Sequence, residues 1–119
     1  MKGTIVTVGI NGGKLTTEIE GPPTLDVLKA AIGGGYLEIV PRFDSYEVSP
    51  GQLVECVAFC DEEGKIYSLP TNNVATVLWD KALRRAGGPG LLQRDGTAAD
   101  ILVGQVAIVF GDDEFMEAL

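Results

Sequence analysis

The sequence predicts an α+β domain in which a mostly antiparallel sheet carries two helices on one face. Short β-branched runs alternate with turn signals rich in glycine, proline and asparagine, which is typical of antiparallel strands. Two other segments repeat apolar residues at helical spacing, and each is bounded by cap residues. The expected order is ββαβββαβ, and strands that follow one another in runs favour α+β over a parallel α/β sheet.

The chain has the size and composition of a single domain, residues 1–119. Its 119 residues can bury a core, and 45% of them are hydrophobic, which is too many for a disordered chain. No apolar run approaches the ~20 residues that a membrane-spanning helix needs. Met1 to Thr4 lead directly into a strand-like pattern, so we expect no signal peptide, no membrane association and a cytoplasmic location.

The first two strands are predicted as a hairpin. Thr4–Val8 alternates and is β-branched, as strands are, and Leu15–Glu20 mixes apolar and polar residues in the same way. Asn11-Gly12-Gly13 between them is a strong tight-turn signal. Gly21-Pro22-Pro23 then breaks the second strand, so the hairpin has one face in water.

The first helix is predicted after this break. Thr24 serves as its N-cap, and Asp26 lies in the first turn, where the helix dipole favours a negative charge. The apolar face consists of Leu25, Val27, Leu28, Ala31 and Ile32. Gly33-Gly34-Gly35 ends the helix, and it lacks the Lys-Ser/Thr ending of a phosphate-binding P-loop.

Three strands are predicted in the middle of the chain. Tyr36–Val40 is the first, and Arg42–Gln52 after it is expected to be a loop. Leu53–Cys60 is the most apolar strand. The polar segment Asp61–Lys65 is expected to be a hairpin tip that returns the chain into a third strand, Ile66–Leu69.

The second helix has the clearest pattern in the chain. Thr71, Asn72 and Asn73 offer N-caps, and a broad apolar stripe follows. The stripe is formed by Val74, Val77, Leu78, Ala82 and Leu83. Gly87-Gly88-Pro89 ends the helix.

The last quarter of the chain is predicted to be a loop, a strand and a tail. Gly87–Gly96 is loop-like, and Ile101–Gly104 with Val106–Phe110 forms a final strand that bends at Gly104. Residues 111–119 form an acidic C-terminal tail with a short helix at Asp112–Glu117.

Composition excludes several kinds of site. The net charge of −8 repels phosphates, so we expect no extended nucleic acid as a partner. Without histidine there is no His-based triad or His metal ligand. Cys56 and Cys60 would lie about 13 Å apart along one strand, too far to form a disulfide, and two thiolates alone form no zinc site. We therefore expect reduced cysteines, no metal and no cofactor.

Several short segments, taken in order, resemble a family of small proteins called domain of unknown function 3846. The segments are Gly35-Tyr36-Leu37-Glu38-Ile39-Val40, Asp61-Glu62-Glu63-Gly64-Lys65, Leu69-Pro70-Thr71-Asn72, Ala75-Thr76 and Val103-Gly104-Gln105-Val106. They extend from the first helix to the last strand. The family occurs largely in bacteriophages and other mobile elements, so the resemblance implies an accessory role against host machinery or host defence, but no chemistry.

One group of candidate ligand-binding residues lies at the start of the second helix. Free amides there attract anions, and Asn72, Asn73 and Thr76 offer side chains to a nucleotide or a sugar. The alternative is that one asparagine only caps the helix while the others face water. Tyr36 is a further candidate, because its ring can stack on a base, and the alternative for it is a place in the core.

A second group lies at the end of the same helix. Lys81, Arg84 and Arg85 cluster there with Arg94 nearby, and arginine forks bind phosphates in a bidentate way. Cations also stabilise a helix C-terminus without any ligand. The two helix ends lie roughly 20 Å apart at ~1.5 Å per residue, so one ligand would contact both only if it were long or shared between subunits of a homo-oligomer.

Three functions are compatible with these residues. The favoured hypothesis is a binding protein without catalysis, which sequesters a small anionic ligand such as a nucleotide signal of host antiviral defence. The alternative is an acidic protein-binding inhibitor or DNA mimic that acts on a host protein. A nucleotide-cleaving enzyme ranks last, because without histidine it would need carboxylates with a metal, or a Thr or Tyr nucleophile.

Overall fold

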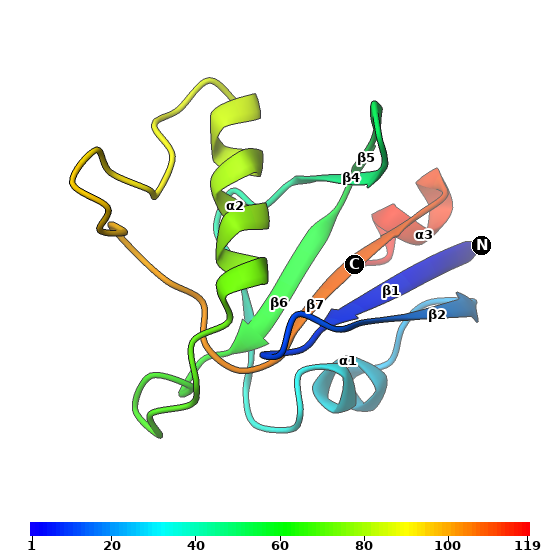
Figure 1. Ribbon diagram of the computed structural model, residues 1–119. Helices are drawn as coiled ribbons and strands as arrows, with labels where there is room; N and C mark the ends of the chain where they lie inside the picture. Colours follow the sequence, from blue (N-terminus) through cyan, green and yellow to red (C-terminus); the bar gives the residue numbers. More distant parts are fainter.

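The centre of the computed structural model, which describes residues 1–119, is a sheet of five antiparallel strands in the order β2-β1-β7-β6-β3 (Figure 1). Its strands are β1 (Lys2–Val8), β2 (Lys14–Glu20), β3 (Leu37–Ile39), β6 (Val57–Asp61) and β7 (Val106–Gly111). A second sheet is the hairpin of β4 (Ser45–Ser49) and β5 (Gln52–Glu55). The helices are α1 (Leu25–Ala31), α2 (Asn73–Arg85) and α3 (Asp113–Glu117). The predicted α+β class is confirmed.

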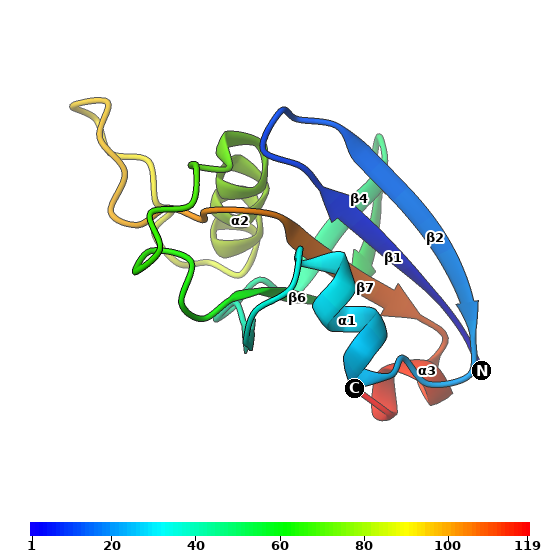
Figure 2. The ribbon, with the colours of Figure 1, turned by 90° about the horizontal axis from the view of Figure 1, so that it is seen from below.

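The prediction that both main helices cover one face of the sheet is wrong. On β7, Val106 and Ile108 belong to the core beneath α2, whereas Ala107 and Val109 belong to the core beneath α1 and α3. The helices therefore cover opposite faces, as Figure 2 shows. The physical reason is that β7 is a continuous apolar run, and a strand of that kind is buried on both faces rather than on one.

The segment Arg42–Gln52, predicted as a loop, contains strand β4, and Leu53–Cys60 is two strands rather than one. Pro50 and Gly51 form the turn between β4 and β5 instead of a longer irregular connection. The break falls at Cys56, whose N–H donates to the Asp44 carbonyl at 3.0 Å. The chain changes sheet there, so β5 and β6 belong to different sheets.

Residues 62–68 form a series of turns, so the predicted strand Ile66–Leu69 is wrong. The carboxylate of Asp61 accepts the N–H of Glu63 at 2.9 Å, and the N–H of Leu69 donates to the Gly64 carbonyl at 3.0 Å. These local hydrogen bonds replace the strand pairing that residue propensity alone suggested. Ile66 consequently has an exposed fraction of 76%.

The predicted helices and their caps are confirmed. Thr24 accepts the N–H of Val27 at 3.2 Å, and Asn72 accepts the N–H of Ala75 at 3.0 Å. The short helix expected in the acidic tail is α3, which buries Phe115 completely. In contrast, Ile101–Gly104 is not a strand and contributes only an isolated bridge from Val103. No helix has the length and apolar character to cross a bilayer.

Candidate functional site

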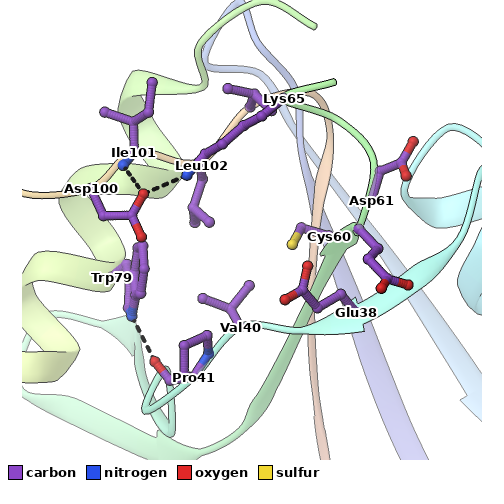
Figure 3. A pocket seen from close by; sticks show the side chains of 12 residues that line it. Glu38, Val40, Pro41, Cys60, Asp61, Lys65, Trp79, Asp100, Ile101 and Leu102 are labelled. Carbon is purple, nitrogen blue, oxygen red and sulfur yellow. Dashed lines mark hydrogen bonds and ion pairs between the residues drawn. The ribbon is translucent and has the colours of Figure 1, made fainter. Parts of the chain in front are cut away.

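A pocket of about 170 Å³ opens between α2 and the edge of the sheet formed by β3 and β6 (Figure 3). Its walls come from four separate parts of the chain: β3 with the residues after it, the end of β6 with the following turns, α2, and the segment before β7. The lining residues are Glu38, Val40, Pro41, Cys60, Asp61, Glu62, Lys65, Trp79, Asp100, Ile101, Leu102 and Val103.

The sheet wall of the pocket is set by strand register. Glu38 on β3 lies directly opposite Cys60 on β6, so both side chains project from the same face of the sheet. That face is the one that α2 covers, since Cys60 packs against the core beneath α2. Figure 3 shows the Glu38 carboxylate and the Cys60 thiol on one side of the pocket, across from Trp79 and Asp100.

Trp79 forms the helix wall and is held in one orientation. Its indole Nε1–H donates to the Pro41 carbonyl at 2.9 Å, and its side chain is almost fully buried. Helix α2 is fixed to the sheet through this bond and through the apolar core around Val40. The aromatic wall is therefore preorganised.

An ion pair borders the upper side of the pocket in Figure 3. The ammonium group of Lys65 lies 2.5 Å from Oδ1 of Asp100, and the same oxygen accepts the N–H of Ile101 at 2.8 Å. The hydrogen bond from Lys65 lowers the pKa of Asp100, with a further contribution from the Ile101 N–H. The pair joins the turns after β6 to the segment before β7, two parts of the chain that are distant in sequence.

The electrostatic character of the pocket is negative. Four carboxylates line it, from Glu38, Asp61, Glu62 and Asp100, whereas Lys65 is the single cation. Asp100 is neutralised by Lys65, and Asp61 accepts a backbone hydrogen bond. Neither Glu38 nor Glu62 makes a side-chain hydrogen bond or ion pair within the chain, so both carboxylates are available to a ligand, and Glu38 lies across the pocket from Trp79.

Cys60 contributes a protonated thiol. Burial, reinforced by the charges of Glu38 and Asp61, raises the pKa of Cys60 to about 11. Cys56 is likewise a free cysteine, and burial with the charge of Asp44 raises its pKa to about 12. Because the thiolate is the nucleophile, neither sulfur is activated near neutral pH.

Two of the residues expected to bind a ligand are buried and bonded within the fold. The Asn72 side chain is fully buried, and its Nδ2 group donates to the carbonyls of Val8 at 2.9 Å and Gly104 at 2.8 Å. The Thr76 hydroxyl donates to the Asn72 carbonyl at 2.8 Å and accepts the Leu102 N–H at 3.0 Å. Both side chains join α2 to neighbouring segments.

The arginines at the end of α2 also contact their own chain. Arg84 donates to Asp80 at 3.0 Å and to the Leu92 carbonyl at 3.1 Å. Arg85 donates from Nε to the Ser45 hydroxyl at 2.9 Å and from Nη2 to the Ser45 carbonyl at 3.1 Å. The two guanidinium groups hold different segments, the chain after α2 and the start of β4, and both arginine residues are exposed.

The other two expected residues, Asn73 and Tyr36, are exposed. Asn73 is the first residue of α2, and Tyr36 precedes β3 with the Lys29 ammonium 6.0 Å from its ring centre. Neither residue lines the pocket. The structure therefore does not bring the six expected residues, Tyr36, Asn72, Asn73, Thr76, Arg84 and Arg85, together in one cavity.

The pocket has no signature in the sequence, because its lining is assembled from segments that are distant in the chain. No local pattern connects Glu38, Trp79 and Asp100, which lie far apart in the sequence. No three His, Cys, Asp or Glu side chains gather in a metal-binding cluster.

A family model described as "Domain of unknown function (DUF3846)" matches residues 1–118. The chain therefore belongs to this family, and the match includes the β1–β2 hairpin and α3 as well as the segments that carry the resemblance. No curated protein and no solved structure matches the chain.

Proposed function

We propose that this member of the DUF3846 family binds a small ligand in the pocket beside α2 and holds it without changing it chemically. The observation that supports this proposal is the unpaired carboxylate of Glu38, which faces a fixed indole wall across a cavity with apolar sides. Small-molecule sites typically combine apolar walls with few polar groups that orient the ligand.

The size and charge of the pocket define the part of the ligand that enters it. Its volume of about 170 Å³ lies below the ~300–1,000 Å³ typical of sites for drug-sized molecules, so only a small group fits. Glu38 favours a group that is cationic or donates hydrogen bonds. A nucleobase with an exocyclic amino group meets both conditions, and the phosphates of its nucleotide would then remain outside, in solvent.

This placement changes where the anionic part of the ligand predicted from the sequence would lie. A phosphate inside the pocket would meet a net negative lining, which disfavours it. We propose that any anionic part of the ligand lies outside the pocket. From the family resemblance we further propose a cytoplasmic accessory role for a phage or mobile element, in which the bound molecule is a nucleotide signal of host defence.

Binding without catalysis is proposed because the thiol and the ion pair in the pocket are not activated for catalysis. The thiol of Cys60 is protonated near neutral pH, and the Asp100 carboxylate is paired with Lys65.

The alternative role as a DNA mimic requires carboxylates gathered on one surface. The two acidic runs at residues 61–63 and 112–114 instead follow β6 and β7, which are antiparallel, so they lie at opposite ends of the sheet.

The pocket can be tested with its own fluorophore, since Trp79 is the single tryptophan and lines the cavity. The emission of Trp79 is recorded during titration with nucleosides, linear and cyclic nucleotides, ADP-ribose and small amines, and thermal stabilisation is measured in parallel. For a ligand that changes the emission, Glu38→Gln should weaken affinity about tenfold, because a charge-assisted hydrogen bond becomes a neutral one.

Glu47→Gln is the matched control, since Glu47 is exposed on β4 and does not line the pocket. It should leave affinity unchanged. The bound ligand is then released by denaturation, and its mass is measured by mass spectrometry. Recovery of a chemically altered ligand would favour an enzyme. Equal affinity in the Glu38→Gln variant, or no response to any probe, would contradict the proposed site.

A further inference from the structure

The outer edge of β2 is open along its whole length. β2 is an edge strand of the sheet and pairs with β1 without a register shift over seven residue pairs. Nothing lies beyond it in Figure 2. Natural edge strands are usually shortened, bulged or interrupted by proline, because an open edge pairs with other chains. Lys14–Glu20 is neither short nor bulged and contains no proline, and its charged side chains are of both signs, so they can pair with those of a second copy.

The register shows which backbone groups of β2 face outwards. At one end of the hairpin the Gly9 N–H donates to the Gly13 carbonyl, and at the other end the Gly21 N–H donates to the Met1 carbonyl. The hydrogen-bonded pairs between β1 and β2 therefore involve odd-numbered residues. Such pairs alternate along an antiparallel ladder. The N–H and C=O groups of Lys14, Thr16, Glu18 and Glu20 therefore point away from β1.

We propose that two copies of the chain associate through β2, antiparallel and about a two-fold axis at Thr17. In this register Lys14 lies opposite Glu20 of the second copy, and Thr16 lies opposite its Glu18. These are the residues with outward backbone groups, so each pair exchanges both backbone hydrogen bonds. One continuous sheet then extends across the two copies, and the interface is isologous.

The side chains of β2 are complementary to themselves in this register. Lys14 with Glu20 joins opposite charges on the α2 side of the sheet, twice by symmetry. On the other side, Leu15 lies opposite Ile19 in a non-hydrogen-bonded pair, where side chains approach most closely. Leu15 has an exposed fraction of 66%, whereas Ile19 packs against the core beneath α1. Pairing would cover Leu15 and extend that core.

The neighbouring registers fit less well. A shift in one direction places Glu18 opposite Glu18 of the second copy, which is a repulsive pair. A shift in the other direction leaves Ile19 and Glu20 without partners. The other sheet edge, β3, has only three residues and carries the pocket. The sequence of β2 therefore selects a second copy of this chain in one register.

The test uses two charge-reversal variants. Each variant should repel a second copy of itself, whereas the two variants should attract each other. In Lys14→Glu each symmetric contact becomes Glu against Glu, and in Glu20→Lys it becomes Lys against Lys. The wild type should sediment as a dimer. Each variant alone should show a dimer dissociation constant raised by about tenfold. The equimolar mixture should regain wild-type association, because both contacts between the two variants then join a glutamate to a lysine.

Lys2→Glu is the matched control. Lys2 lies opposite Glu20 within the hairpin, so this variant creates a like-charge pair inside one chain but leaves the contact between copies intact. It should dimerise as the wild type does. A monomeric wild type at high micromolar concentration, dimers that persist in both reversal variants, or a mixture that fails to associate would each overturn the proposal.

Amide hydrogen exchange gives a measurement that needs no substitution. The N–H groups of Thr16 and Glu18 should be protected in concentrated protein and exchange freely after dilution. The Thr17 N–H, which faces β1, should stay protected in both conditions. Free exchange of Thr16 and Glu18 at all concentrations would also overturn the proposal.

Discussion

Asn72 connects three parts of the chain through one buried amide. Its Oδ1 atom accepts the Ala75 N–H at the start of α2, and its Nδ2 group donates to carbonyls at the end of β1 and just before β7. Neither carbonyl has water as a substitute at a fully buried site. The side chain therefore fixes the helix start against the centre of the sheet.

We predict that Asn72→Ala lowers the free energy of unfolding by about 3 kcal/mol. The helix cap contributes ~1 kcal/mol, and each buried carbonyl left without a donor adds ~1 kcal/mol or more. Asn72→Ser keeps the cap acceptor and should recover only the ~1 kcal/mol that the helix cap contributes. The measurement is urea denaturation, and Asn73→Ala is the control, since Asn73 is exposed and should change stability by less than ~0.5 kcal/mol. Equal effects at the two positions would contradict this assignment.

At the scale of elements, α2 holds the long segment that follows it through Asp80. The carboxylate accepts the N–H groups of Leu91 at 2.6 Å and Leu92 at 3.1 Å, and Arg84 donates to it from the next turn at 3.0 Å. Gly90 has no side chain, and this allows the loop to pass against the carboxylate, where any Cβ would collide. A segment without a strand or helix of its own is thereby fixed to the helix.

The stability that Asp80 contributes through these hydrogen bonds should depend on pH. Burial by itself raises the pKa of Asp80, but the hydrogen bonds from Leu92, Arg84 and Leu91 outweigh it and lower the pKa below its ordinary value near 3.8. A lowered pKa in the folded state adds stability above the unfolded-state value, and that stability is lost as the pH falls through the folded-state value. The ionised carboxylate therefore contributes fully at neutral pH.

We predict that Asp80→Asn lowers the free energy of unfolding by about 2 kcal/mol at pH 7, since hydrogen bonds to a charged acceptor become weaker ones. The difference from the wild type should shrink as the pH falls below about 4. Urea denaturation at several pH values measures both effects. Asp44→Asn is the control, because the Asp44 side chain is exposed and makes no hydrogen bond. A difference that is independent of pH would show that charge is not the cause.

Local patterns predicted the helices better than they predicted the strands. Thr24 and Asn72 mark helix starts because capping uses residues three positions apart. Ile66 and Tyr67 have strand propensity, yet Asp61 and Gly64 close turns around them, and propensity is overridden by such hydrogen bonds. The pocket could not be predicted, because Glu38 and Asp100 are far apart in the sequence. They line the same cavity only after β3, β6 and α2 have packed together.

At the scale of the whole molecule, one sheet separates two cores. Trp79 and Ala82 of α2 cover one face, whereas Phe115 of α3 and Leu28 of α1 cover the other. Each of β1, β6 and β7 contributes residues to both cores. Loss of packing on one face should therefore be transmitted to the other, because the same strands carry residues of both cores and a small single domain unfolds as one cooperative unit.

We predict that Phe115→Ala destabilises both cores together, by about 3–5 kcal/mol, as expected for removal of a fully buried aromatic side chain. Trp79 emission reports the core beneath α2, and far-UV circular dichroism reports the whole fold. In urea denaturation the two midpoints should move down together, while Leu119→Ala, in the same segment but exposed, should move neither. A Trp79 transition that stays at the wild-type midpoint while the circular dichroism transition shifts would show that the two cores unfold independently.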